Sequence, residues 1–300
     1  MIEEKKKVLF LTKYKYNKPE KKTSTTILCD HIKGRGHKIY YADPNEINII
    51  LNKDNVSVFY GDIDITDVDI VISRNTKGVV EKVDQIIKIL KSKGAAIFGH
   101  EEKTPFSYRK FDNHLKFLEY FPKTVYFAKN NKEKALDFLS RADIKFPFIL
   151  KPEGSSKGIG VALIKNEEDF VSYFDNEEVK NYSDFIMQEY LDVLNEYRVF
   201  ILGKKSLGAC EKFGENLIAK NFAQGGSFIY VKDEEVESLA ERLSLEIEHH
   251  ILGFDIIRTK SGELKLLEIN AWPAFMGFEE ASRINMAEKI FDYYLDCLNS

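Results

Sequence analysis

The chain has 300 residues, of which 44% are hydrophobic and 31% are charged, and its 44 Lys and Arg against 48 Asp and Glu give a net charge of -4. This length suits two or three subdomains, and the composition is typical of a folded globular protein. The charge balance argues against nucleic acid as a partner, and no apolar run approaches the ~18 residues of a membrane span. The cysteines, Cys29, Cys210 and Cys297, are far apart and predict neither a disulfide framework nor a zinc site. With no secretory signal at the start, we expect a cytoplasmic protein.

The first 100 residues alternate between strand and helix patterns. Ser24 or Thr25 is expected to cap a helix that ends near Gly34 and Gly36, and a second helix is expected to cover 78–93. Strands are expected at 7–12, 37–42, 68–73 and 95–98. Such alternation is typical of a mostly parallel α/β sheet, whose ligands bind beyond the carboxyl ends of the strands. Arg74 stands at such an end, although an ordinary surface arginine is the commoner explanation. We therefore predict an α/β domain over residues 1–103.

Two regions of mixed helix and strand follow, and we place them at 104–184 and 185–300. The first is expected to hold a connecting helix over 104–121, a helix over 132–141, and strands at 124–127, 148–151 and 161–164. The second is expected to hold a long helix over 233–250, a closing helix over 284–298, and strands at 185–191, 197–202, 254–258 and 264–269. The predicted fold class is thus α/β, with a parallel N-terminal domain followed by a two-part α+β unit.

A glycine-rich loop between two strands is the most informative segment. One strand ends at Lys151, the loop carries Gly154-Ser155-Ser156, Gly158 and Gly160, and a strand resumes at Val161. Glycines let the backbone approach a ligand closely, and successive N–H groups can then surround phosphate oxygens, with the Lys151 ammonium on the same phosphates. It is neither a Walker A loop nor a Rossmann turn, because it joins two strands. A flexible Gly/Ser hairpin remains the alternative.

Oxygen-bearing side chains lie on two strands near the C-terminus. Glu268 and Asn270 are two residues apart, so they face one side of a strand, and Asp255 lies on the preceding strand of a hairpin turned at Ser261-Gly262. Two carboxylates and an amide oxygen inside an apolar sheet suit a hard cation such as Mg²⁺, whereas without a cation their like charges would repel. An ordinary polar face of the hairpin remains the alternative.

The order of these segments resembles the ATP-grasp superfamily, and the chain's ending resembles its RimK-type branch of ATP-dependent amino-acid ligases. The resemblance runs from about Lys110 to the end, whereas the first hundred residues agree only in their α/β pattern. Besides the glycine loop, it rests on Gln188-Glu189-Tyr190-Leu191, Glu196-Tyr197-Arg198, Asn221, Asp255 and Glu268-Ile269-Asn270. It implies an ATP-grasp fold with a central subdomain that carries a glycine-rich lid and a C-terminal subdomain that carries the metal site.

The resemblance also implies a role for each matched residue. It assigns ATP binding to Lys110, Lys151, Gly154, Ser155, Ser156, Gly158, Gly160, Gln188, Glu189, Tyr190, Leu191 and Glu196. It assigns one or two Mg²⁺, which Mn²⁺ could replace, to Asp255, Glu268 and Asn270. It assigns Arg198 and Asn221 to catalysis, facing the transferred phosphate and the acyl intermediate. Taken singly, Arg198 could equally be an ion-pair partner and Asn221 a turn residue.

The sequence departs from the RimK-type pattern at two places. Ala271-Trp272-Pro273-Ala274-Phe275 stands where small residues and a glycine are usual, so Trp272 and Phe275 are expected to line or crowd the acceptor end of the site. The usual arginine two positions before Asn221 is Ala219, with Lys220 beside it. These departures put in question the amino acid and its acceptor, not the nucleotide half of the site.

The implied activity is an ATP- and Mg²⁺-dependent carboxylate–amine ligase that acts through an acylphosphate. Its substrates would be a small-molecule or peptide carboxylate and an amine, such as a glutamate-like amino acid. No nucleic acid or membrane is expected as a partner, and the open possibilities include a homo-oligomer. The enzyme would have only to position the reactants and neutralise charge. Two alternatives stay open: a small-molecule kinase on the same framework and a non-catalytic nucleotide-binding module.

Overall fold

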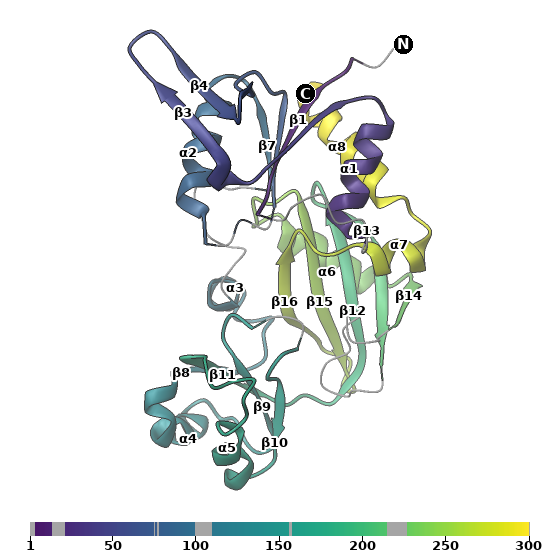
Figure 1. Cartoon of the computed structure of the whole chain (residues 1–300). Coiled ribbons are helices and arrows are strands. Elements are labelled where there is room, and N and C mark those ends of the chain that lie inside the picture. The colour runs from purple at the N-terminus through teal and green to yellow at the C-terminus, as the bar shows by residue number, and fades with distance from the viewer. Residues whose placement is uncertain are drawn as a thin grey trace.

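The computed structural model describes residues 4–13, 22–74, 76, 78–99, 110–155, 158–214 and 227–299. Within these ranges the strands form a parallel sheet, a small three-stranded sheet beside it, a four-stranded antiparallel sheet and a five-stranded antiparallel sheet (Figure 1). In Figure 1 the five-stranded sheet lies between the N-terminal elements and the smaller antiparallel sheet. The predicted α/β class with a parallel N-terminal sheet is confirmed, whereas the division of the chain at residues 103 and 184 stays a prediction.

The N-terminal parallel sheet has the strand order β2-β1-β6-β7. Its strands are β1 (Lys7–Leu11), β2 (Lys38–Ala42), β6 (Ile70–Ser73) and β7 (Ala96–Phe98). All of them were predicted, because buried parallel strands are short, nearly continuous apolar runs.

Two helices accompany this sheet, α1 (Ser24–Gly34) and α2 (Val80–Ser92). The cap of α1 is Thr23, not Ser24 or Thr25, because the Thr23 side chain and Thr26 form a reciprocal capping box. In α2 the buried residues repeat at helical spacing, as the sequence predicted.

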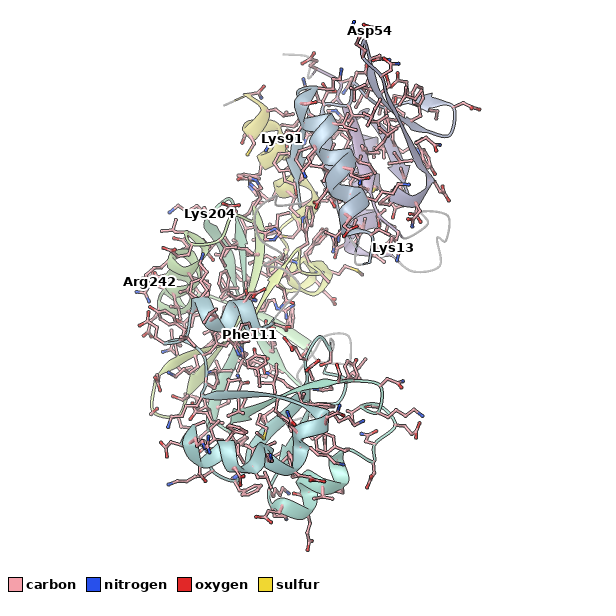
Figure 2. All side chains as sticks on the ribbon, turned by 90° about the vertical axis from the view of Figure 1, so that its left-hand side faces the viewer. Lys13, Asp54, Lys91, Phe111, Lys204 and Arg242 are labelled. Carbon is pink, nitrogen blue, oxygen red and sulfur yellow. The ribbon has the colours of Figure 1, made fainter. Side chains whose placement is uncertain are left out.

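A protruding hairpin in the N-terminal region was not predicted. It consists of β3 (Ile47–Leu51), β4 (Val56–Tyr60) and β5 (Ile63–Asp64), and a short 3₁₀ helix, η1 (Pro44–Glu46), precedes it. Asp54 marks its tip at the top of Figure 2. Leu51 is 69% exposed, so this hairpin lacks the buried alternation that identifies a strand in a sequence.

The four-stranded antiparallel sheet has the order β10-β9-β11-β8. Its elements are β8 (Thr124–Ala128), η2 (Lys129–Asn131), α4 (Lys132–Arg141), β9 (Phe148–Pro152), β10 (Ala162–Ile164), α5 (Glu167–Tyr173) and β11 (Asp184–Glu189). Before it, α3 (Lys110–Lys116) is shorter than the expected connecting helix, of which residues 104–109 lie outside the described residues.

The five-stranded sheet has the order β14-β13-β12-β15-β16 and is antiparallel throughout. Its elements are β12 (Val193–Leu202), β13 (Lys205–Phe213), β14 (Ser227–Val231), α6 (Glu234–Ser244), β15 (Ile251–Thr259), β16 (Leu264–Ala271), α7 (Met276–Ser282) and α8 (Met286–Asn299). The expected helix over 233–250 is wrong in its second half, because α6 ends at Ser244. The β15–β16 hairpin turns at Gly262, which has a φ of +90°, as predicted.

The two faces of the five-stranded sheet pack against different partners. Val199 and Ile201 face a core that includes residues of α6, whereas Phe200 and Leu202 face a core that includes Val8 and Phe10 of β1 and residues of α7 and α8. This alternation follows from the two-residue period of a strand. The N-terminal region and the C-terminal sheet therefore share one continuous core, which fixes their relative position. None of the helices in the described ranges combines the length and the apolar composition that a bilayer crossing requires.

Candidate active site

A buried ion pair crosses the centre of the five-stranded sheet. Arg198 on β12 lies opposite Asp255 on β15, and Nε and Nη2 of Arg198 donate to Oδ1 and Oδ2 of Asp255 at 2.5 Å each. The two side chains are 14% and 6% exposed. Such a two-point contact fixes the plane of the guanidinium as well as its position. The predicted catalytic arginine and one predicted metal ligand are therefore direct partners.

Lys212 on β13 joins this pair, and the sequence did not single it out. Its Nζ lies 2.7 Å from Oε1 of Glu196 and 3.0 Å from Oδ1 of Asp255, and its side chain is only 2% exposed. Glu196 and Arg198 are two residues apart on β12, so they share a face. The sequence signal that could have identified Lys212 is its position two residues after Cys210, which places both side chains on one face of a strand. Because the strand β13 was not predicted, this signal could not be used.

The charges of this cluster stabilise one another. Burial alone would raise the pKa of Asp255, but Arg198 and Lys212 outweigh it and hold that pKa below its usual value. Burial would likewise lower the pKa of Arg198, but Asp255, Glu268 and Glu196 raise it overall. Asp255 and Arg198 are therefore both charged near neutral pH, within an apolar sheet where electrostatic interactions are strong.

Glu268 and Asn270 extend the same face onto β16. Asp255 pairs with Glu268 and Gly253 with Asn270 across the hairpin, while Ile269 between them points into the opposite core. A register shift beside Asp255 leaves Leu267 as an extra residue, so the strand is bent where the carboxylate stands. The predicted placement of the three oxygen donors on neighbouring strands is thus what the register shows.

The fit of this trio to a metal ion is partial. Both oxygens of Asp255 accept from Arg198, whereas within the described residues no hydrogen bond or ion pair is recorded for the side chains of Glu268 and Asn270. In the part of the chain that the structure covers, no three His, Cys, Asp or Glu residues gather as a metal site. The expected trio does not depend on such a group, because its third member is an asparagine. Carboxylate and amide oxygens suit Mg²⁺. The metal assignment stays a prediction.

Lys151 and Gln188 form a second polar group, on the four-stranded sheet. Nζ of Lys151 donates to Oε1 of Gln188 at 2.9 Å, and Nε2 of Gln188 lies 3.1 Å from Oγ1 of Thr124. Gln188 is 4% exposed. Its side chain therefore orients the lysine ammonium from the neighbouring strand.

The chain leaves this sheet directly after Glu189. The Glu189 amide donates to the Lys123 carbonyl at 3.0 Å, and the Lys123 amide donates to the Glu189 carboxylate at 2.7 Å. Tyr190 and Leu191 follow β11 and lead towards β12, with Tyr190 43% exposed. The predicted strand to Leu191 thus ends at Glu189, and the rest of this segment, which is expected to bind ATP, connects the two antiparallel sheets.

The glycine-rich loop connects β9 to β10, as predicted, with φ angles of +75°, +77° and +69° at Gly154, Gly158 and Gly160. A Cβ on Gly160 would lie 2.7 Å from Val179, whereas a Cβ on Gly154 would meet nothing within 4 Å. The hydroxyl of Ser155 is buried and donates to the Pro152 carbonyl at 3.0 Å. Gly160 therefore has a packing role, and Gly154 lies beside open space.

Several predicted site residues cannot be placed in this geometry. The side chain of Lys110, the first residue of α3, lies outside the described residues, as do Ser156, Lys220 and Asn221. The described site residues fall into two groups, Lys151 with Gln188 on one sheet and the Arg198 cluster on the other. Phe275 is 1% exposed inside the shared core, so it is not free to line an acceptor site.

Comparison with known proteins identifies the family. A RimK-like ATP-grasp domain is matched over residues 121–294, which is more than half of the chain. The chain belongs to the RimK-like ATP-grasp family. The resemblance predicted from the sequence is thereby confirmed, and with it an ATP-grasp ligase as the class of enzyme.

Curated relatives and solved structures agree with this family. A probable alpha-L-glutamate ligase of Haemophilus ducreyi is 30% identical over 50% of this chain and 50% of its own length. One of Stenotrophomonas maltophilia is 25% identical over 90% of this chain and 93% of its own length. The chain thus spans about half the length of the first relative and nearly all of the second. The ATP-grasp ligase PsnB, solved with a minimal precursor, Mg and ADP, superposes with a TM-score of 0.69 at 14% identity over 98% of both chains, which shows a shared fold.

Proposed function

We propose that the protein is an ATP- and Mg²⁺-dependent carboxylate–amine ligase that adds a glutamate-like amino acid to a small molecule or peptide through an acylphosphate. The single observation that carries the proposal is the buried cluster of Arg198, Lys212, Asp255 and Glu196, which brings two cations and two carboxylates together on one sheet face next to Glu268. Burial of such a cluster in an apolar sheet costs desolvation free energy, so its presence favours a role in binding a charged ligand.

The chemistry has two balanced steps. A substrate carboxylate oxygen attacks the γ-phosphorus of ATP and ADP leaves, which forms an acylphosphate. The amine of the second substrate then attacks the acyl carbon, phosphate leaves with the bonding electrons, and the nitrogen loses a proton. Both steps concentrate negative charge on transferring oxygens, and preorganised cations stabilise such charge most effectively where water is excluded.

The chain's own residues supply this stabilisation. In the proposal, Arg198 and Lys212 face the transferred phosphoryl group, and Asn221 faces the acyl intermediate. Asp255, Glu268 and Asn270 would hold Mg²⁺, with Mn²⁺ as a substitute, and the cation would neutralise phosphate charge. Because Asp255 already binds Arg198, the carboxylate would hold the cation and the guanidinium in a fixed relation to each other.

The four-stranded sheet supplies the remaining nucleotide contacts in this proposal. Lys151, oriented by Gln188, would bind the α- and β-phosphates together with the loop from Gly154 to Gly160, and Lys110 would add a further contact. The backbone of Glu189, Tyr190 and Leu191 would hold adenine. The Glu189 amide already donates to the Lys123 carbonyl, so the proposal assigns the Glu189 carbonyl to adenine. Glu196, held through one oxygen by Lys212, would use the other for the ribose hydroxyls.

Relatives support the choice of amino acid and the range of acceptors. Both relatives described above are named probable alpha-L-glutamate ligases, and the solved neighbour PsnB holds a minimal precursor. We therefore propose glutamate as the first amino acid to test and both peptides and small carboxylates as acceptors. The cluster of charges around Asp255 favours a ligase over a nucleotide-binding module, because its ion pairs are all present among the described residues.

The test is incubation with Mg-ATP, pooled amino acids and candidate acceptors, followed by measurement of ADP, AMP and product mass. ADP with a condensed product supports the ligase. A phosphorylated acceptor would establish the kinase instead, ATP binding without turnover would establish the binding module, and AMP would refute an acylphosphate. Glu268→Gln should abolish turnover while ATP still binds, and Glu263→Gln in the exposed turn before β16 is the matched control.

A further inference from the structure

Arg74 is a half-buried cation, and within the described ranges no carboxylate pairs with it. It follows β6 at the carboxyl end of the parallel sheet, and its Nη1 is buried with no hydrogen-bond partner among the described residues. Burial lowers the pKa of Arg74 to about 10. The groups that partly raise this pKa again are Tyr294, Cys29 and Tyr41, none of which is a carboxylate. An isolated buried charge is costly, so the position predicts an anionic partner that the described part of the chain does not supply.

A second arginine in the same region shows what a structural arginine looks like. Arg35 stacks on Phe291 with its guanidinium carbon 5.1 Å from the ring centre, and it forms an ion pair with Asp292. Arg74 stacks at the same 5.1 Å on Trp272, but among the described residues no carboxylate pairs with it. The two arginines thus share the aromatic contact and differ in the counter-ion.

The aromatic partner of Arg74 is held in a strained backbone conformation. Trp272 has a φ of +54°, which is rare for a bulky residue. Residues in such strained conformations cluster at functional sites. The strain places the indole against Gly99, where an added Cβ would lie 2.4 Å from the indole Nε1. Gly99 therefore leaves room for the indole beside the end of β7, which ends at Phe98.

Two other polar groups stand at this end of the parallel sheet. The hydroxyl of Tyr294 is fully buried and has no hydrogen-bond partner among the described residues, and its ring centre lies 6.2 Å from that of Trp272. Lys13, at the corresponding end of β1, adds positive charge at the lower margin of the N-terminal sheet in Figure 2. This edge therefore offers donors and positive charge, with no acid recorded against Arg74.

The location connects this edge to the proposed reaction centre. Trp272 follows directly on β16, two residues after Asn270 and four after Glu268. Arg74 therefore stands where the N-terminal sheet meets the end of the strand that carries two of the proposed metal ligands. A substrate that reaches from the reacting phosphate towards the N-terminal sheet would end at this arginine.

We propose that Arg74, stacked on Trp272, binds a substrate carboxylate that stays unreacted during ligation. This proposal rests on the ligase function proposed above. An amino acid that reacts through its amine keeps its α-carboxylate, and a dicarboxylic acceptor keeps its second carboxylate, so both substrates offer the same chemistry. A guanidinium binds a carboxylate through two parallel hydrogen bonds, which would also satisfy the buried Nη1.

The experiment measures binding to the protein loaded with Mg²⁺ and a non-hydrolysable ATP analogue. Calorimetry with L-glutamate represents the amine substrate, and glutarate represents the carboxylate substrate. Arg74→Met should weaken at least one probe tenfold or more, with Arg74→Lys intermediate and analogue binding unchanged. The probe that weakens identifies the substrate. For L-glutamate, the α-amide should bind equally to the wild type and Arg74→Met.

Arg35→Met is the matched control, and thermal unfolding separates a binding role from a structural one. Arg35→Met should lower the unfolding midpoint and leave both probes unaffected, whereas Arg74→Met should not lower the midpoint, because it removes an unpaired buried charge. Unchanged dissociation constants for both probes in Arg74→Met, or no binding of either probe by the wild type, would overturn the proposal. Arg74-dependent binding without any condensed product would instead refute the ligase and retain the carboxylate site.

Discussion

Arg198 and Asp255 face each other across β12 and β15 and make two hydrogen bonds of 2.5 Å, with Lys212 3.0 Å from the same carboxylate. The aspartate therefore holds two buried cations that the proposed mechanism needs at the transferred phosphate. Its removal affects folding and catalysis for the same electrostatic reason, and the two effects can be measured separately.

Asp255→Asn should destabilise the fold by about 3–5 kcal/mol, because loss of one partner leaves buried charges uncompensated. Urea unfolding monitored by circular dichroism measures the change. Asp292→Asn, which removes the partly exposed partner of Arg35, should cost no more than ~1 kcal/mol. An equal loss of unfolding free energy in both variants would contradict the conclusion that the pair of Arg198 and Asp255 is shielded from water.

Asp255 should also make stability depend on pH in the acid range. Burial opposes but does not overcome the effect of Arg198 and Lys212, so the pKa of Asp255 is lower in the folded chain than in the unfolded one. The stabilisation is therefore complete above the unfolded value of about 3.9 and is lost as the pH falls through the lower folded value. The difference in unfolding free energy between wild type and Asp255→Asn, measured from pH 2 to 7, should shrink below pH 4. A constant difference would show that Asp255 does not titrate as the structure implies.

The glycine-rich loop separates a packing effect from a nucleotide effect. Gly160→Ala should destabilise the fold clearly more than Gly154→Ala, because its Cβ would lie 2.7 Å from Val179 whereas that of Gly154 meets open space. Both positions also carry the ~1–2 kcal/mol cost of a left-handed backbone. Gly154→Ala should instead raise the KM for ATP several-fold and lower the unfolding midpoint by no more than this backbone cost. The reverse order of midpoints would refute this division.

Sequence reasoning was most reliable where the signal was local. The buried residues of α2 and the strands of the parallel sheet were predicted because helical spacing and short apolar runs are written in consecutive residues. The cap of α1 was misplaced by one residue, since three adjacent Ser and Thr can each cap and only the capping box with Thr26 selects Thr23.

The part of the site that escaped prediction depends on contacts between distant strands. Lys212 is significant because β13 brings it to Glu196 and Asp255, sixteen and forty-three residues away along the chain. The side-chain role of Gln188 likewise appears only when β11 and β9 pair and bring Lys151 beside it. Residue type alone could not distinguish these groups from ordinary strand residues, because the strand register is a property of the folded sheet.

Lys151→Met should raise the KM for ATP at least tenfold and change the unfolding midpoint little, because the ammonium is oriented by the neutral Gln188 amide. A charge-assisted phosphate contact is worth roughly 1.5–3 kcal/mol, which corresponds to a change of about 10- to 150-fold in affinity. Lys165→Met, at an exposed position just after β10, is the control and should leave the KM unchanged.

Gln188→Leu distinguishes orientation by Gln188 from direct nucleotide contact by its side chain. If Gln188 acts by holding Lys151, the double variant with Lys151→Met should bind ATP no more weakly than Lys151→Met alone, since a positioning residue has no effect once its partner is absent. Nucleotide affinity measured by calorimetry on the four proteins of this cycle gives the coupling between the two positions. Fully additive losses would show that the Gln188 side chain contacts ATP independently of the lysine.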